Sequence, residues 1–240
     1  SDIVETTAFG ANKLVLPEFD LVDQTRKLNE QAVQIARAAC EKYTSKNKPR
    51  FVAGSIGPGT KLVTLGHTDW DTIFDSYLEQ VRGLLDGGVD LLLIETAQDL
   101  LQIKVALNAC LQAMGERGQS ADDVPMMVQV TIETTGTMLL GTEIAAAVTA
   151  LGRFPILSLG MNCATGPEFM TDHLRTLAGL SRFPVACVPN AGLPDEDGRY
   201  NETPEMMDTT LGRFIQEGWV NLVGGCCGTT PEHIRSIAKA

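Results

Sequence analysis

Near its C-terminus the chain reads Val223-Gly224-Gly225-Cys226-Cys227-Gly228-Thr229-Thr230-Pro231-Glu232-His233-Ile234. An apolar run over residues 220–223 leads into this stretch, and Thr230 followed by Pro231 is a typical helix start. The glycines permit a sharp turn between the two elements. The stretch therefore predicts a strand-to-helix turn that carries Cys226 and Cys227, in the place where α/β proteins usually hold their chemistry.

The same alternation of apolar strand and amphipathic helix runs through the whole chain. The expected strands are residues 3–6, 51–56, 89–94, 126–132, 156–162, 185–188 and 220–223. The expected helices cover residues 28–39, 68–85, 99–114, 143–151, 166–180 and 203–215, with a last one after Thr230. Regular βα alternation indicates a parallel sheet, which is either doubly wound or closed as a barrel.

Polar residues at the strand ends favour the barrel. They are Glu5, Glu95, Cys163, Asn190, Cys226 and Cys227. An open doubly wound sheet concentrates its site at one switch point, and no G-x-G-x-x-G follows a strand here. We therefore expect one domain over residues 1–240, a TIM-type (β/α)8 barrel with seven βα units present and the first unit missing. The start at Ser1, without methionine, is typical of a fragment.

The composition excludes several classes of protein. A formal net charge of −11 and a pI near 4.7 argue against binding to nucleic acids or to anionic membranes. No apolar run is long enough to span a membrane, and no signal segment opens the chain, so we expect a cytoplasmic protein. Without such a signal, the six cysteines indicate metal, catalytic or core thiols rather than a disulfide framework.

Three thiols fall at strand ends: Cys163 and the pair Cys226 and Cys227. In a barrel their strands are next-but-one neighbours, near enough for one tetrahedral ion. Three protein ligands leave a fourth position open, which is typical of catalytic zinc, and such a site activates a substrate thiol. Alternatively, the vicinal pair is a redox disulfide or two small buried hydrophobes.

The remaining cysteines and the histidines are weaker candidates. We expect Cys40, Cys110 and Cys187 to be core thiols. We expect His67 in a loop, His173 in a helix and His233 in the first turn of the last helix. We interpret His233 as structural or exposed rather than as a ligand.

Glu95 and Asn190 are candidates for substrate binding. A buried carboxylate at the end of an apolar strand needs solvent, a donor or a cation, and the ammonium group of an amino acid would suit Glu95. The alternative is that Glu95 has a structural role and caps the loop that follows the strand. Asn190 follows Pro189 and is either a plain turn residue or a neighbour of the metal.

Six segments of the chain resemble the homocysteine S-methyltransferase family, and within it the homocysteine-binding module of cobalamin-dependent methionine synthases. They are Asp2-Ile3-Val4-Glu5-Thr6, Ala53-Gly54-Ser55-Ile56-Gly57-Pro58, Leu93-Ile94-Glu95-Thr96, Gly160-Met161-Asn162-Cys163, Pro189-Asn190-Ala191-Gly192-Leu193-Pro194 and Gly224-Gly225-Cys226-Cys227-Gly228-Thr229-Thr230-Pro231. They cover the chain nearly end to end in the family's order.

The resemblance implies a zinc ion held by Cys163, Cys226 and Cys227, with the sulfur of homocysteine as the incoming ligand. It implies that Glu95 binds the amino group of homocysteine and that Asn190 lies beside the metal. The methyl group would come from methylcobalamin on another module, with folate-binding and reactivation modules also in the parent protein. Betaine or S-methylmethionine is the alternative methyl donor, and a non-catalytic redox or metal-binding module is the alternative of another class.

One family motif is absent from this sequence. The family's first strand carries an Asp-Gly-Ala-Met-Gly-Thr type motif that helps to bind the amino acid. A barrel without it exposes strand edges and lacks part of the substrate site. We therefore expect the 240 residues alone to hold zinc weakly and to form no methionine.

Overall fold

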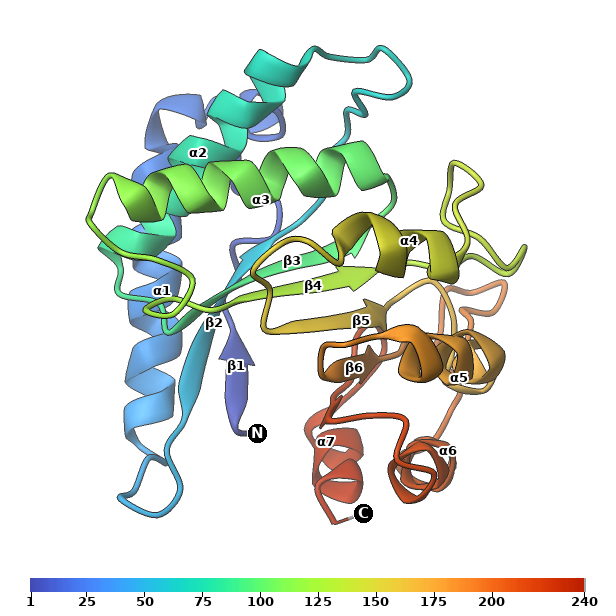
Figure 1. Cartoon of the computed structure of the whole chain (residues 1–240). Helices are drawn as coiled ribbons and strands as arrows, with labels where there is room; N and C mark the ends of the chain where they lie inside the picture. The colour runs from blue at the N-terminus through green and yellow to red at the C-terminus, as the bar shows by residue number, and fades with distance from the viewer. Residues whose placement is uncertain (240) are drawn as a thin grey trace. The chain divides into compact units, whose positions relative to one another are not determined.

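The computed structural model describes residues 1–239 and alternates strands with helices along the chain (Figure 1). The strands are β1 (Ile3–Glu5), β2 (Phe51–Ile56), β3 (Leu91–Ala97), β4 (Met126–Val130), β5 (Ser158–Asn162), β6 (Val185–Val188) and β7 (Leu222–Val223). The helices are α1 (Thr25–Glu41), α2 (Trp70–Asp86), α3 (Leu100–Gly115), α4 (Ile144–Leu151), α5 (Thr171–Leu180), α6 (Pro204–Gln216) and α7 (Pro231–Ile237). Short 3-10 helices are η1 (Leu16–Phe19), η2 (Val22–Gln24) and η3 (Glu168–Met170).

The predicted fold class is confirmed. Among the described residues the sheet has seven strands, hydrogen-bonded in the order β1 to β7. Strand β1 pairs with β2, β2 with β3, β5 with β6 and β6 with β7, all in parallel, as expected when each strand is followed by a helix. The chain divides into two compact units, Ser1–Met127 and Val128–Ala240.

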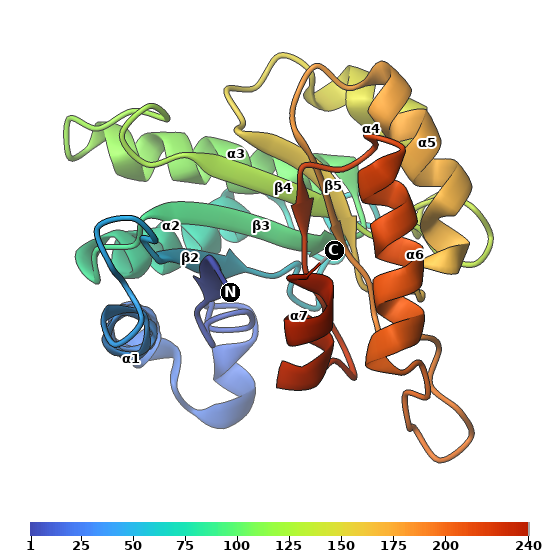
Figure 2. The same ribbon diagram turned by 90° about the horizontal axis from the view of Figure 1, so that it is seen from below.

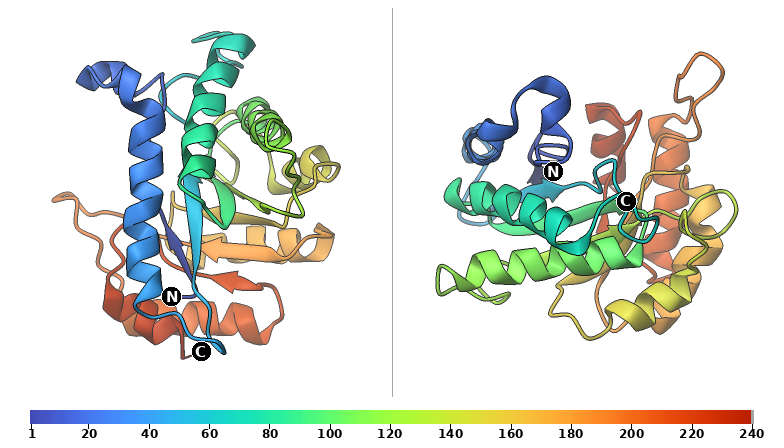
Figure 3. Two further views of the ribbon diagram at one scale, coloured as in Figure 1. Left: turned by 90° about the vertical axis from the view of Figure 1, so that its left-hand side faces the viewer. Right: turned by 90° about the horizontal axis from the view of Figure 1, so that it is seen from above.

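In the first unit β2 pairs with β1 on one side and with β3 on the other, in the registers Val4 to Val52 and Ser55 to Leu93. Helices α1, α2 and α3 pack in sequence, and α1 and α2 run side by side (Figure 3). A Cβ on Gly83 would lie 2.4 Å from the carbonyl oxygen of Arg26, so glycine allows this close approach. The core consists largely of Val33, Val52, Ile73, Leu84, Leu92, Ile103 and Leu107.

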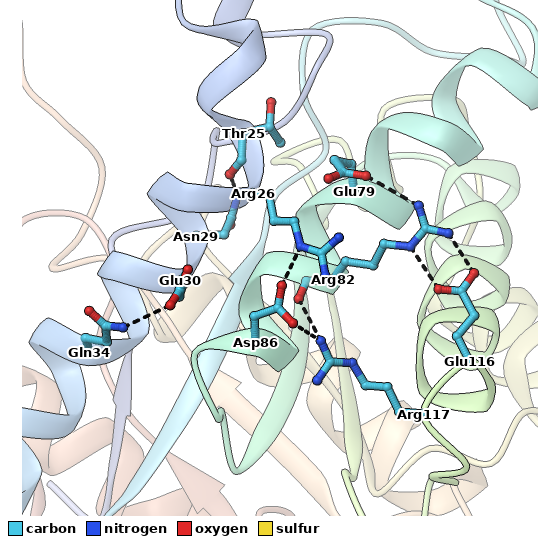
Figure 4. Close-up of polar contacts among 10 residues, drawn as sticks. All are labelled: Thr25, Arg26, Asn29, Glu30, Gln34, Glu79, Arg82, Asp86, Glu116 and Arg117. Atoms are coloured by element: carbon cyan, nitrogen blue, oxygen red, sulfur yellow. Dashed lines mark hydrogen bonds and ion pairs between the residues drawn. The ribbon is translucent and has the colours of Figure 1, made fainter.

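A polar network on the outer surface links α1 and α2 with the residues that directly follow α3 (Figure 4). Asp86 of α2 receives hydrogen bonds from both Arg26 of α1 and Arg117, and the bond from Arg26 is the main reason why its pKa lies below the usual range. Arg82 forms a two-pronged ion pair with Glu116, at 2.7 and 2.8 Å. Because the side chains remain partly exposed, each pair contributes little stability alone, and the network mainly fixes helix positions.

In the second unit β6 pairs with β5 and β7. Helix α4 packs on α5, and α6 packs beside α7 (Figure 2). The buried side chains include Leu159, Leu174, Leu177, Leu211 and Phe214. A Cβ on Gly160 would lie 2.4 Å from the carbonyl oxygen of Ala186, so a glycine in β5 lets β6 approach closely.

Two details of the predicted elements are wrong. Strand β3 runs to Ala97, so Glu95 and Thr96 lie within the strand rather than ending it. Thr68 and Asp71 resemble a capping box in the sequence, but the side chain that caps α2 belongs to Asp69, which accepts a hydrogen bond from the Thr72 N–H at 2.7 Å. Asp69 and Thr68 are both good N-cap residues, and only the backbone geometry decides between them. No helix within residues 1–239 is both long and apolar enough to cross a membrane.

Candidate metal centre

The three predicted thiols converge in the second unit. Cys163 directly follows β5, while Cys226 and Cys227 lie in the turn between β7 and α7. The Sγ atoms of Cys163 and Cys227 are 3.7 Å apart, and those of Cys226 and Cys227 are 3.9 Å apart. All three sulfurs lie within 4.8 Å of one another, and Cys227 is exposed. The cluster can therefore hold a cation and leave one side of it accessible.

An unusual backbone turn brings Cys163 to this cluster. Cys163 and Ala164 both have φ of 57°, in the left-handed region that disfavours residues with a Cβ. Thr165 N–H closes the turn on the carbonyl of Cys163 at 2.6 Å. On the facing turn Gly228 has φ of 78°, where glycine carries no such cost. Backbone strain of this kind is concentrated at functional sites.

Two buried asparagines support the cysteines. The Oδ1 atom of Asn190 accepts the N–H of Cys227 at 3.1 Å, and the Nδ2 atom of Asn162 donates to Cys226 Sγ at 4.0 Å. Pro189 accepts the N–H of Cys226 at 2.8 Å. The loop after β6 thus binds the backbone of both vicinal cysteines, so Asn190 is built into the cluster rather than being a plain turn residue.

The cluster distributes negative charge unevenly among its thiols. The pKa of Cys163 falls to about 6, mainly because Cys226 donates a hydrogen bond to its sulfur. The same bond raises the pKa of Cys226, since Cys226 keeps its proton in order to donate it. Burial raises the pKa of Cys227. Of the three thiols, Cys163 is therefore the one that loses its proton most readily.

The sulfur positions fit a zinc ion. Tetrahedral zinc with sulfur ligands at about 2.3 Å places neighbouring sulfurs about 3.8 Å apart. Two of the three separations, 3.7 and 3.9 Å, match that value, and the third lies within 4.8 Å. Three thiolate donors with an accessible side correspond to a catalytic rather than a closed structural site.

A family profile described as homocysteine S-methyltransferase matches residues 1–240. The chain belongs to the homocysteine S-methyltransferase family. The family resemblance inferred from the sequence motifs is thereby confirmed.

Curated relatives of this family member include two methionine synthases. The chain is 46% identical to the one from Mycobacterium leprae and 47% identical to the one from Mycobacterium tuberculosis, over 243 residues in each case. These alignments cover 100% of this chain and 20% of each relative. The chain therefore spans about a fifth of the length of the curated relatives it matches.

Solved structures agree on the fold of this homocysteine S-methyltransferase family member. The metallated form of the homocysteine methyltransferase MmuM from Escherichia coli aligns with a TM-score of 0.80 and 24% identity. The alignment covers 100% of this chain and 80% of that one. The apo form of the same enzyme aligns with a TM-score of 0.73. At this identity the likeness bears on the fold alone, and it supports the incomplete barrel.

The other predicted substrate residue, Glu95, lies in the first unit. It is 7% exposed and accepts a hydrogen bond from Ser55 Oγ at 2.6 Å. Although the Glu5 residue as a whole is exposed, desolvation of its carboxyl, with repulsion from Glu95 as a second cause, raises the pKa of Glu5 to about 7. A positively charged group placed beside the two carboxylates would relieve this repulsion.

The raised pKa of Glu5 predicts a pH-dependent stability. Glu5 binds its proton more tightly in the folded chain than at its ordinary pKa of 4.5. Its contribution to stability is therefore complete below pH 4.5 and is lost as the pH rises through about 7. Because the side chain still reaches solvent, we discount the effect to about 1 kcal/mol.

The measurement is urea unfolding of wild type and Glu5→Gln between pH 4.5 and 8. The variant is expected to gain about 1 kcal/mol relative to wild type across that range. Glu18→Gln, which removes one charge at an exposed position of the same unit, is the matched control for the change of charge. A difference between Glu5→Gln and wild type that does not change with pH would contradict the assignment.

Sequence reasoning identified the cysteines but missed part of their support. Cys40, Cys110 and Cys187 are buried core thiols, as predicted. Asn162 was visible only as the end of a strand, although its place directly before Cys163 was a signal. His233 is 6% exposed, so the possibility that it is exposed is wrong. His233 stands three residues after the N-cap Thr230, at the position that completes a capping box. This spacing could have indicated the hydrogen bond between the two residues.

Proposed function

We propose that this chain is the zinc-dependent homocysteine-binding barrel of a methionine synthase, extending over residues 1–240. The observation that carries the proposal is the convergence of three thiols, all within 4.8 Å, on a partly open cluster. Membership of the homocysteine S-methyltransferase family, together with identities of 46% and 47% to two methionine synthases, supports homocysteine as the methyl acceptor. The metallated state of the structurally similar MmuM is consistent with a metal at such a site.

In the proposed site Cys163, Cys226 and Cys227 hold the zinc ion. A bound zinc ion supplies Lewis acidity, which lets a substrate thiol lose its proton near neutral pH. Asn190 fixes the backbone of Cys227 through its Oδ1 atom and lies next to the cluster. Asn162 keeps its amide directed at Cys226. The strained turn at Cys163 and Ala164 places the first sulfur before any ligand arrives.

Glu95 is proposed to bind the ammonium group of homocysteine. Its side chain is buried and fixed by Ser55, so the carboxylate has a defined direction. An ammonium ion also neutralises the repulsion between Glu95 and Glu5. The buried carboxylate of the first unit is therefore suited to an ammonium group.

The overall reaction transfers a methyl group to this sulfur. The sulfur electron pair forms the new S–C bond, the bond from carbon to its carrier breaks with its electrons left on the carrier, and the thiol proton goes to solvent. We propose methylcobalamin on another module of the parent protein as the carrier, with folate-binding and reactivation modules as further partners. A cytoplasmic location and a single-domain barrel are part of the same proposal.

The test measures metal and substrate together. Kept in excess free zinc, so that even a weak site is filled, the chain is expected to bind one zinc per chain and to release protons on addition of homocysteine. Zinc X-ray absorption should then show an additional sulfur ligand. Homoserine, which carries a hydroxyl in place of the thiol, is the matched control and should change neither signal.

Two results would contradict the proposal. A Cys226–Cys227 disulfide in the purified chain, with no uptake of metal after its reduction, would favour a non-catalytic redox module. Methyl transfer by the parent protein from betaine or S-methylmethionine, but not from methylcobalamin, would replace the proposed donor while leaving the metal site in place.

A further inference from the structure

His233 connects the metal loop to a distant part of the second unit. It lies in the first turn of α7, and its imidazole is 6% exposed. The Nδ1 atom lies 3.1 Å from the backbone nitrogen of Thr230, and the Nε2 atom lies 2.8 Å from the carbonyl oxygen of Glu202. Glu202 belongs to the charged segment between β6 and α6, far from α7 along the chain.

These bonds determine the tautomer of His233. The backbone N–H of Thr230 can only donate, so Nδ1 must accept and carries no hydrogen. The ring proton therefore resides on Nε2, which donates to the carbonyl of Glu202. The hydroxyl of Thr230 also lies 2.9 Å from Nδ1. Both nitrogens are then used by Thr230 and Glu202, and the imidazole has no free nitrogen for a metal.

The bonds through His233 close a circuit on Cys227. The N–H of Glu202 donates to the carbonyl of Ala191 at 3.1 Å, and the N–H of Ala191 donates to the carbonyl of Cys227 at 2.9 Å. From Cys227 the backbone returns through Thr230 to His233. We call this loop of bonds the His233 circuit. Through this circuit the carbonyl of Cys227, a candidate metal ligand, is bound by Ala191, which lies outside the turn that carries Cys227.

We propose that His233 is a positioning residue for the metal site, acting through Glu202 and Ala191 to hold Cys227 in place. The inference rests on the proposed zinc site. His233 touches neither the metal nor the substrate. Its contribution is to keep the Cys226–Cys227 turn in a geometry that suits the ion, as outer partners of metal ligands do elsewhere.

The competing explanation is helix capping alone. In a capping box the third residue accepts the N–H of the N-cap residue, and Nδ1 of His233 does this for Thr230. The bond from Nε2 to Glu202 is not part of a capping box. A variant that keeps the first bond and loses the second therefore separates the two roles.

Two substitutions make that separation. In His233→Asn the amide oxygen takes the place of Nδ1 and can still accept from Thr230, whereas the side chain is too short to reach Glu202. His233→Ala loses both bonds. Glu232→Gln changes an exposed neighbour in the same turn, outside the His233 circuit, and is the matched control.

The measurements are zinc affinity, by competition with a chelator, and the absorption spectrum of the cobalt(II)-loaded chain. His233→Asn and His233→Ala are each expected to weaken zinc binding about 10- to 100-fold. Both should also shift the thiolate-to-cobalt absorption bands, which a general loss of helix stability would leave unchanged. Glu232→Gln should match wild type in both measurements.

Wild-type affinity and spectrum in His233→Asn would overturn the inference, because capping alone would then be sufficient. If His233→Ala fails to fold, His233→Asn still decides the question. A wild-type chain that takes up neither zinc nor cobalt would overturn the proposed function and this inference together. If wild type takes up zinc and His233→Asn shows the same zinc affinity and cobalt spectrum, the inference is overturned and the proposed function is not.

Discussion

Replacing Cys163, Cys226 or Cys227 by serine is expected to weaken zinc binding roughly 100- to 1,000-fold, since structural zinc sites with four protein ligands bind with about 10–16 kcal/mol, or about 2.5–4 kcal/mol per ligand. A serine hydroxyl keeps its proton near neutral pH and is a poor replacement for a thiolate. The three substitutions should have similar effects because each sulfur belongs to the same cluster. Chelator competition, with zinc content after dialysis, measures the loss.

The matched control is Cys187→Ser. Cys187 lies on β6, close along the chain to the loop that supports the cluster, but its side chain is fully buried. This change buries a hydroxyl and should lower the stability of the chain while leaving one zinc bound. Full zinc retention in any one of the three cluster variants would remove that cysteine from the ligand set.

Gly160→Ala is expected to lower the free energy of unfolding by about 3 kcal/mol or more, at the upper end of the range for overpacked interiors. The added Cβ would lie 2.4 Å from the carbonyl oxygen of Ala186 and 2.6 Å from its Cβ. Backbone atoms cannot rotate away, so β5 and β6 must separate. Since β5 leads directly to Asn162 and Cys163, the variant should also lose zinc affinity.

Gly179→Ala is the comparison for that prediction. Gly179 lies inside α5, and a Cβ there would meet nothing within 4 Å. Alanine is favoured over glycine in a helix interior by roughly 0.5–1 kcal/mol, so this variant should be more stable than wild type. Urea unfolding measures both variants, and equal stabilities would contradict the close approach of β5 and β6.

The order of elements could be predicted because it depends on local patterns. Apolar runs alternate with amphipathic segments, and starts such as Thr203-Pro204 and Thr230-Pro231 mark helices α6 and α7 correctly. The thiols were identifiable because cysteines at strand ends are chemically distinctive. Glu95 was placed just beyond its strand because an acidic residue after a run of leucines resembles an end, whereas β3 continues to Ala97.

The support of the site could not be predicted because it depends on contacts between distant residues. Nothing in the local sequence shows that Asn190 accepts from Cys227, or that His233 reaches Glu202. The left-handed turn at Cys163 and Ala164 could not be predicted from the sequence for a related reason. Neither residue type favours positive φ, so the surrounding fold must impose that conformation.

That turn also limits which residues position 164 can accept. In a library of all substitutions selected only for thermal stability, glycine would be enriched there, since it avoids the roughly 1–2 kcal/mol cost of a left-handed residue. β-Branched residues would be depleted under every selection. The wild-type alanine at φ of 57° therefore makes the turn stiffer and the chain less stable than glycine would. Its replacement by glycine should raise the stability of the chain and lower the rigidity of the turn that holds Cys163.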